Sequence, residues 1–291
     1  MSNLRDVRLR MRAIRQTLQV TKAMNLISTA KLRKGRRLLE DTEPYFTRIQ
    51  KSMFDILSGV QQVNSKFFVP PKQRVGSHAA ILVVTTDKGL AGGYNANIFR
   101  QVNTLCGKVK NPVLILIGSI GYRYFSHTAY QILENFSFHS QIPTVDDAKE
   151  ISDYVISQYL WGMFSEAHIV YTHMYSSIKL LPSQRQLFPL DAKQIQEELS
   201  QKRTELQFEF LPSEEEVFDA LAPLYIKGII YGSLVEAYVS EQSARMTAMD
   251  EASKSAEDML AALQMSYNRA RQAGITQEVT EIISGSAAVR D

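Results

Sequence analysis

The sequence predicts an α/β protein: a long antiparallel coiled coil of N- and C-terminal helices with an inserted Rossmann-like parallel-sheet domain. Three observations lead to this fold class. A helical pattern occupies residues 213–289 with no proline after Pro223, apolar residues recur in three-four steps near the N-terminus, and the middle of the chain holds short β-branched runs between helical stretches.

The C-terminal helix is expected to begin after Ser213, because Ser213 and Glu216 match a capping box, in which each side chain accepts a hydrogen bond from the other residue's backbone N–H. At 1.5 Å per residue, about 70 helical residues span roughly 105 Å, so the helix has to extend beyond any domain of this size. A heptad pattern in it predicts a left-handed supercoil with a partner helix, at Met249, Ala252, Ala256, Met259, Leu263, Ser266, Ala270 and Ala273.

The partner helix is expected at the other end of the same chain. No glycine or proline interrupts the first 34 residues, and Pro44 predicts a kink before the helical pattern continues to Leu57. The alternative, two amphipathic helices lying flat on a globular core, is disfavoured by their length. The apolar residues of the N-terminal helix repeat in the same three-four rhythm at Leu4, Val7, Met11, Ile14 and Leu18.

The middle of the chain predicts the sheet domain. Strands that alternate with helices imply right-handed crossovers and a mostly parallel sheet. Strands are expected at residues 79–85, 113–117, near Tyr130, at 167–172 and at 206–210, with helices at about 95–109, after 117 and, behind the capping residue Thr144, to about 164. The predicted organisation is a coiled-coil helix at 1–58, a Rossmann-like domain at 77–211 and a second coiled-coil helix at 213–291.

The composition is that of an ordinary folded protein, with 291 residues, 45% hydrophobic and 22% charged. A single cysteine, Cys106, excludes an internal disulfide framework, and no run approaches the roughly 18 apolar residues of a membrane span. The arginine-rich start is similar to a mitochondrial transit peptide, but a heptad that begins at Leu4 leaves no room for a cleavable segment.

Positive charge gathers in the first 40 residues. They carry eight arginines and three lysines against Asp6 and Glu40, a net charge of +9, whereas the whole chain carries +3. Such a segment is either a solvated helix face or a basic collar that meets an acidic surface of phosphates or carboxylates.

One stretch invites a nucleotide-binding interpretation, the glycine-rich residues 87–95 between the first predicted strand and the next helix. Its glycines match neither the dinucleotide fingerprint nor the P-loop, so a structural tight turn is the favoured interpretation.

No catalytic, cofactor or metal site is predicted. The five histidines lie far apart and no pair has the i, i+4 spacing of a helical metal site, and no serine stands in a nucleophile-elbow pattern. His168 and His173 are expected to pack or hydrogen-bond around a strand, and Cys106, Trp161 and Met163 to lie in the core.

Over essentially its whole length, the chain resembles the gamma subunits of rotary F-type ATP synthases of bacterial type. The motifs that carry this resemblance lie at residues 19–24 and 30–33, 86–95, 240–246, 268–273 and 275–285. Three residues depart from the family pattern, which usually has glutamate at Asn25, cysteine at Ala91 and alanine at Ser286. The change at Asn25 makes the basic segment more basic and bears on a contact beside Met24.

The resemblance implies a non-catalytic rotor shaft, one copy per complex, at the cytoplasmic face of the bacterial inner membrane. It would couple ion flow through the membrane rotor ring of c subunits to ATP synthesis or hydrolysis in a ring of alpha and beta subunits, with the epsilon subunit beside its globular domain and no cofactor or nucleic acid. Contacts with the catalytic ring are expected from Lys22, Met24, Arg245, Gln272, Thr276, Glu278 and Glu281. An apolar bearing tip is expected from Ile282, Ile283, Ala287, Ala288 and Val289.

Two other functions compete with this one. A coiled-coil nucleic-acid-binding protein would use the basic N-terminal helix on phosphates, although the segment lacks interleaved aromatic residues and any known binding module. An enzyme with a Rossmann domain and a dimerising rod is weakened by the missing phosphate fingerprint.

Overall fold

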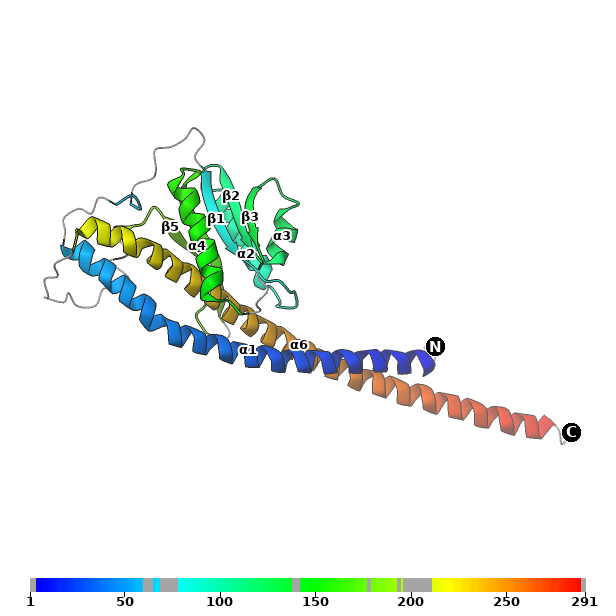
Figure 1. Cartoon of the computed structure of the whole chain (residues 1–291). Coiled ribbons are helices and arrows are strands. Elements are labelled where there is room, and N and C mark those ends of the chain that lie inside the picture. Colours follow the sequence, from blue (N-terminus) through cyan, green and yellow to red (C-terminus); the bar gives the residue numbers. More distant parts are fainter. Residues whose placement is uncertain are drawn as a thin grey trace. The chain divides into compact units, whose positions relative to one another are not determined.

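The computed structural model describes residues 4–59, 65–68, 78–137, 142–176, 179–192, 195 and 211–288. The chain divides into two units. Met1–Thr29 and Arg245–Asp291 form what we call the coiled-coil unit, and Ala30–Ala244 form the sheet unit. The two long helices, α1 (Leu4–Gly59) and α6 (Glu214–Ala288), contribute residues to both units (Figure 1).

Both long helices contain a proline and continue through it. α1 passes Pro44 without interruption, which confirms the predicted continuation to Leu57, and α6 passes Pro223. α6 begins as its capping pattern predicts, because the Ser213 hydroxyl accepts a 3.2 Å hydrogen bond from the N–H of Glu216. By length and composition α6 is apolar enough to cross a membrane, but 56% of its apolar window is buried within the protein, as in a core helix.

Within the coiled-coil unit, α1 and α6 pair in an antiparallel arrangement. The Ser253 hydroxyl donates to that of Thr21 at 2.8 Å, and the Arg8 guanidinium donates to the Tyr267 hydroxyl at 2.7 Å. The α1 residues turned toward α6 are buried or half-buried, and they include all five of the predicted apolar positions. This row, which we call the α1 seam, consists of Leu4, Val7, Met11, Ile14, Leu18, Thr21, Asn25 and Ser28.

The predicted heptad of α6 is partly wrong. Met249, Ala252, Ala256, Leu263 and Ala270 are buried or half-buried as predicted, but Met259 is 53% exposed, and Ser266 and Ala273 are exposed as well. Alternate positions of the seam lie one residue further on, so the α6 seam reads Met249, Ser253, Ala256, Leu260, Leu263, Tyr267, Ala270 and Gly274. The prediction preferred Met259 for its apolar side chain, whereas a serine, a tyrosine and a glycine occupy true seam positions.

The register is defined by the hydrogen-bonded pair Thr21 on α1 and Ser253 on α6. Because the helices are antiparallel, the residue numbers of any two facing seam residues add to the same sum, 274. The same register places Leu18 opposite Ala256 and Val7 opposite Tyr267. The pairing inside the sheet unit independently follows this rule. A Cβ added at Gly228 would overlap the Phe46 ring, and one added at Gly35 would lie 2.7 Å from Val239, so glycine permits close approach of the helices at both places.

The sheet unit holds five strands in the order β3-β2-β1-β4-β5. The first four run parallel, and β5 pairs with β4 antiparallel at the edge. Ala80 of β1 lies beside Val113 of β2 and Ala167 of β4, which sets the register of the centre. The elements are β1 (His78–Val84), α2 (Tyr94–Cys106), β2 (Pro112–Ile117), α3 (Ser119–Phe125), β3 (Gln131–Phe136), α4 (Val145–Leu160), β4 (Phe164–Met174) and β5 (Leu180–Phe188).

Four predicted strands are therefore confirmed, while β5 was not predicted and the expected strand at 206–210 lies outside the described residues. β5 escaped prediction because Pro182 interrupts its pattern, and proline in a strand is compatible with an edge position. α4 ends four residues earlier than predicted. Trp161 is 68% exposed and Met163 41% exposed, so assigning them to the core was wrong.

The central strands are buried on both faces, which is why they read as continuous apolar runs. Part of the core joins β1 and β2 to α2 through Ile81, Leu114 and Ile98. α6 is tied to this domain by polar contacts: the Tyr94 hydroxyl donates to the carbonyl of Ala237 at 3.1 Å, and Ser240 donates to that of Thr172 at 2.9 Å.

Candidate functional site

The predicted contact residues of α1 lie on the outside of the coiled-coil unit. The Lys22 ammonium is 2.6 Å from the Glu257 carboxylate of α6, yet its side chain is 57% exposed. An exposed ion pair of this kind contributes about 0–1 kcal/mol, so it leaves Lys22 able to meet another surface. Met24 is half-buried beside the seam.

Sequence reasoning missed the apolar neighbours of Met24. Val20 is 56% exposed and Ile27 is 55% exposed, and their spacing from Met24 places all three on one stripe of α1. Leu26, 71% exposed, lies on another side of α1, one turn from Lys22. The signal was present in the sequence, because these apolar residues fall outside the three-four phase of the seam and so are not used by it.

The predicted contact residues of α6 differ in exposure. Arg245 is only 7% exposed within the free chain. Gln272, Thr276 and Glu278 are all exposed, and Glu281 is exposed while it accepts a 2.9 Å hydrogen bond from Gln277 one turn earlier. The four exposed residues are available to a partner in the free chain, whereas Arg245 already packs within it.

The predicted bearing tip is partly described. Ile282 is 70% and Ile283 61% exposed, and Ile275 and Val279 are exposed on the same helix. Ala287 and Ala288 belong to α6, but their side chains lie outside the described part of the chain, as does the whole of Val289. Exposed large apolar residues on a helix mark a surface that a partner can cover.

The glycine-rich loop is held by its own polar groups. The Asn95 amide donates to the Thr86 hydroxyl at 2.8 Å and accepts from the Thr86 N–H, and Leu90 and Gly92 adopt positive φ angles. The Asp87 carboxylate accepts from both the N–H and the hydroxyl of Ser119 at 2.9 Å. A protein carboxylate thus occupies the start of α3, where a phosphate would otherwise be favoured.

A cavity of about 80 Å³ lies beside this loop, at the carboxyl ends of β1 and β2. Open α/β sheets usually bind their ligands at this edge. Its lining includes three carboxyl groups, from Asp87, Asp147 and Glu241, and no lysine or arginine. The cavity therefore repels phosphates, which supports the structural interpretation of the loop.

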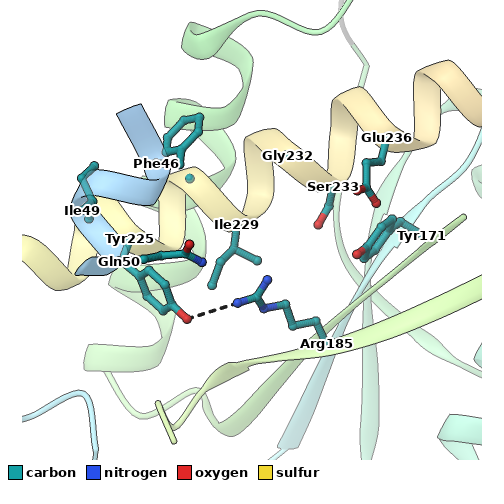
Figure 2. A pocket seen from close by; sticks show the side chains of 11 residues that line it. Phe46, Ile49, Gln50, Tyr171, Arg185, Tyr225, Ile229, Gly232, Ser233 and Glu236 are labelled. Atoms are coloured by element: carbon teal, nitrogen blue, oxygen red, sulfur yellow. Dashed lines mark hydrogen bonds between the residues drawn. The ribbon is translucent and has the colours of Figure 1, made fainter. Parts of the chain in front are cut away.

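A second cavity, of about 120 Å³, lies among α1, α6, β4 and β5 in the sheet unit. Figure 2 shows Arg185 reaching from β5 toward Tyr225 and Ile229, while Glu236 and Ser233 approach Tyr171 from α6. The lining residues are Phe46, Ile49, Gln50, Tyr171, Arg185, Tyr225, Gly228, Ile229, Gly232, Ser233 and Glu236.

Several polar groups of this second cavity have partners within the chain. Arg185 donates to the Tyr225 hydroxyl at 3.2 Å, and Glu236 is 2.7 Å from the His173 ring. Burial, assisted by the Glu236 carboxylate, raises the pKa of Tyr171 above its usual value, so this phenol stays neutral. The arrangement joins α6 to the sheet and contains no nucleophile activated by a base.

The remaining chemically active residues also have structural roles. His168 and His173 both lie in β4, where they were predicted to pack or hydrogen-bond: His173 bonds to Glu236 at 2.7 Å, whereas the buried Nε2 of His168 lies 3.6 Å from Glu166, too far for a hydrogen bond. Cys106 is buried as predicted, and burial raises the pKa of its thiol to about 11, which leaves it protonated and unreactive near neutral pH. Among the described residues, no group of three or more histidine, cysteine or acidic side chains could hold a metal ion.

The sequence matches a family of known proteins along nearly all of its length. The family model described as ATP synthase matches residues 3–289. The ATP synthase gamma chain of Ruminiclostridium cellulolyticum is 43% identical over 291 residues, covering 99% of both chains. That of Acetivibrio thermocellus is 39% identical over 295 residues and covers all of both chains.

Solved structures share the fold. A chain of the mitochondrial ATP synthase of Euglena gracilis in rotational state 3 superposes with a TM-score of 0.66 at 17% identity, covering 98% of this chain and 94% of that one. A chain from the central stalk and c-ring structure of the Tetrahymena thermophila enzyme gives a TM-score of 0.61 at 23% identity, covering 80% and 99%.

Proposed function

The chain belongs to the ATP synthase gamma-chain family and is the central-stalk subunit of an F-type ATP synthase; from this premise we propose that its coiled-coil unit turns inside the ring of alpha and beta subunits. The observation that best supports this proposal is the pairing of the two ends of the chain in one register, in which Arg8 contacts Tyr267, 259 positions further along the sequence. Two helices joined along their length resist twisting better than one, and a shaft has to transmit torque.

The proposed contacts with the catalytic ring lie on the outside of this unit. Met24, with the neighbouring Val20 and Ile27, forms an apolar face on α1, and Lys22 offers a basic contact on another side of this helix, because residues two apart do not share a face. On α6 we assign contact to Gln272, Thr276, Glu278 and Glu281, and to Arg245 only after a local rearrangement, because it is buried in the free chain. Ile282 and Ile283, with Ala287, Ala288 and Val289, form the proposed bearing tip.

The chain itself is proposed to be non-catalytic. Its sheet edge is acidic where an enzyme of this fold would bind phosphate, and the ordered polar groups of the larger cavity serve α6. The epsilon subunit and the c ring are the remaining proposed partners, and the cytoplasmic face of a bacterial membrane is the proposed location. The Tetrahymena thermophila structure that shares this fold is described as central stalk and c ring, which supports this assignment.

The rotor mechanism can be tested with two disulfide bonds in the assembled complex, after substitution of Cys106 with serine. A bond between Leu18→Cys and Ala256→Cys joins facing positions of one rotor, so ATPase activity should be retained. A bond from Met24→Cys to a cysteine in a catalytic-ring subunit joins a turning part to a fixed one. Activity should then fall to background and return on reduction.

The matched reduced samples control for the substitutions themselves. Full turnover by a complex in which the Met24 cross-link is verified on a gel would remove rotation from this account. Loss of activity with the internal Leu18–Ala256 bond would instead contradict the assignment of α1 and α6 to a single turning body.

A further inference from the structure

The α1 seam changes character along its length. From Leu4 to Leu18 it is apolar, and it then continues as Thr21, Asn25 and Ser28. Thr21 is 7% exposed and Ser28 1% exposed, so polar residues occupy positions where a coiled coil gains most from apolar ones. On α6, Ser253 does the same at 7% exposed.

The hydroxyl groups of this segment pair across the two helices. Ser253 donates to Thr21 at 2.8 Å, and Thr21 donates to the carbonyl of Leu18 at 3.1 Å. The Ser253 hydroxyl also lies 2.8 Å from the carbonyl of Met249, so each hydroxyl has an acceptor in its own helix and only the bond between Ser253 and Thr21 depends on how the two helices are paired. Losing that bond would disfavour another pairing by about two- to tenfold.

Asn25 adds a second bond between the helices. Its side-chain amide donates to the backbone carbonyl of Met246 on α6 at 3.1 Å. This carbonyl accepts from an N–H, and an ionised carboxylate has none to offer. Only a donor of this length at position 25 can make the contact.

Close approach at Gly35 and Gly228 keeps this register within the sheet unit, whereas the apolar part of the coiled-coil seam, taken by itself, is compatible with more than one. Sliding the helices by one heptad would bring Leu18 from Ala256 to Met249, another apolar contact. The same slide would bring Ser253 opposite Ile14 and Thr21 opposite Met246, where neither hydroxyl meets the other. We propose that Thr21, Asn25 and Ser253 form a register lock, which selects one of several apolar pairings of the two ends of the chain.

The test measures register in the full chain alone, by disulfide formation in a Cys106→Ser background, and so is independent of the proposed partners. One double variant pairs Leu18→Cys with Ala256→Cys, the native neighbours, and a second pairs Leu18→Cys with Met249→Cys, one heptad away. With the lock intact, the second pair should oxidise at least about tenfold less than the first. With Thr21→Val, Asn25→Leu and Ser253→Ala, its yield should rise at least about tenfold.

A matched control makes the same chemical changes at exposed positions, as Thr17→Val, Asn268→Leu and Ser255→Ala, and should leave the shifted pair unreactive. The apolar lock variant should also keep or raise the unfolding temperature of the chain. If the three polar residues served stability alone, replacing them would lower that temperature. If the shifted pair stays unreactive in the lock variant, the proposal is overturned. Asn25→Asp alone keeps the size but removes the donor, and no increase of the shifted disulfide in that variant would overturn the assignment of Asn25.

Discussion

Single residues decide how closely the backbone elements of the sheet unit approach one another. Gly118, which joins β2 to α3, has a φ of +94°, a conformation that L side chains rarely adopt. A Cβ at this position would overlap the backbone carbonyl of Thr85. The Thr85 hydroxyl completes the turn, since it donates to Ile117 at 2.7 Å and accepts from Gly121 at 3.0 Å.

Gly118→Ala should therefore lower the free energy of unfolding by at least about 2 kcal/mol, because backbone strain and overlap act together. Gly89→Ala is the matched control in the neighbouring loop, where a Cβ meets nothing within 4 Å, and should change stability by less than about 0.5 kcal/mol. The midpoints of urea unfolding curves measure both. Equal effects of the two substitutions would refute the assigned role of Gly118.

At the scale of elements, the long helices and central strands could be predicted because their patterns are sustained over many residues. β5 could not, since Pro182 breaks its pattern, even though it follows β4 directly and pairs with it. The outer contact residues Lys22 and Met24 were found through motif similarity, whereas Val20 and Ile27 emerged only once the seam was known. The α6 phase failed because Ser253 and Tyr267 pack by hydrogen bonds that no hydrophobic pattern reveals.

The corrected phase of α6 makes a prediction for two adjacent residues. Leu260→Ala removes a half-buried seam side chain and should cost about 1 to 2 kcal/mol of unfolding free energy. Met259→Ala removes a side chain that is 53% exposed and should cost less than about 0.5 kcal/mol. Thermal unfolding followed by circular dichroism gives the comparison, and a larger loss at Met259 would restore the phase predicted from sequence.

At the scale of the whole molecule, charge is distributed unevenly along the chain, so different parts of it favour partners of opposite charge. The first 40 residues carry +9, whereas the cavity at the carboxyl edge of the sheet is lined by Asp87, Asp147 and Glu241. The positive segment explains why nucleic-acid binding competed as a function on sequence alone. Similarity along the full length, rather than charge, decides in favour of the gamma-chain family.

The acidic sheet edge predicts that the isolated chain binds no nucleotide. In equilibrium dialysis at micromolar concentrations, ATP and NAD should distribute equally across the membrane. Substitution of Gly89, Gly92 and Gly93 with alanine should leave that result unchanged. Micromolar binding that disappears with this substitution would show that the glycine-rich loop cradles phosphate after all.

The antiparallel pairing of the chain ends has a consequence for biosynthesis. Tyr267 is translated 259 residues after Arg8, its hydrogen-bond partner. At a translation rate of about 5–20 residues per second, roughly 13 to 52 seconds pass between the synthesis of the N-terminal segment and that of its partner segment in α6. During that time the apolar row from Leu4 to Leu18 has nothing of its own to pack against, and the five arginines between Arg5 and Arg15 keep the nascent segment soluble by mutual repulsion.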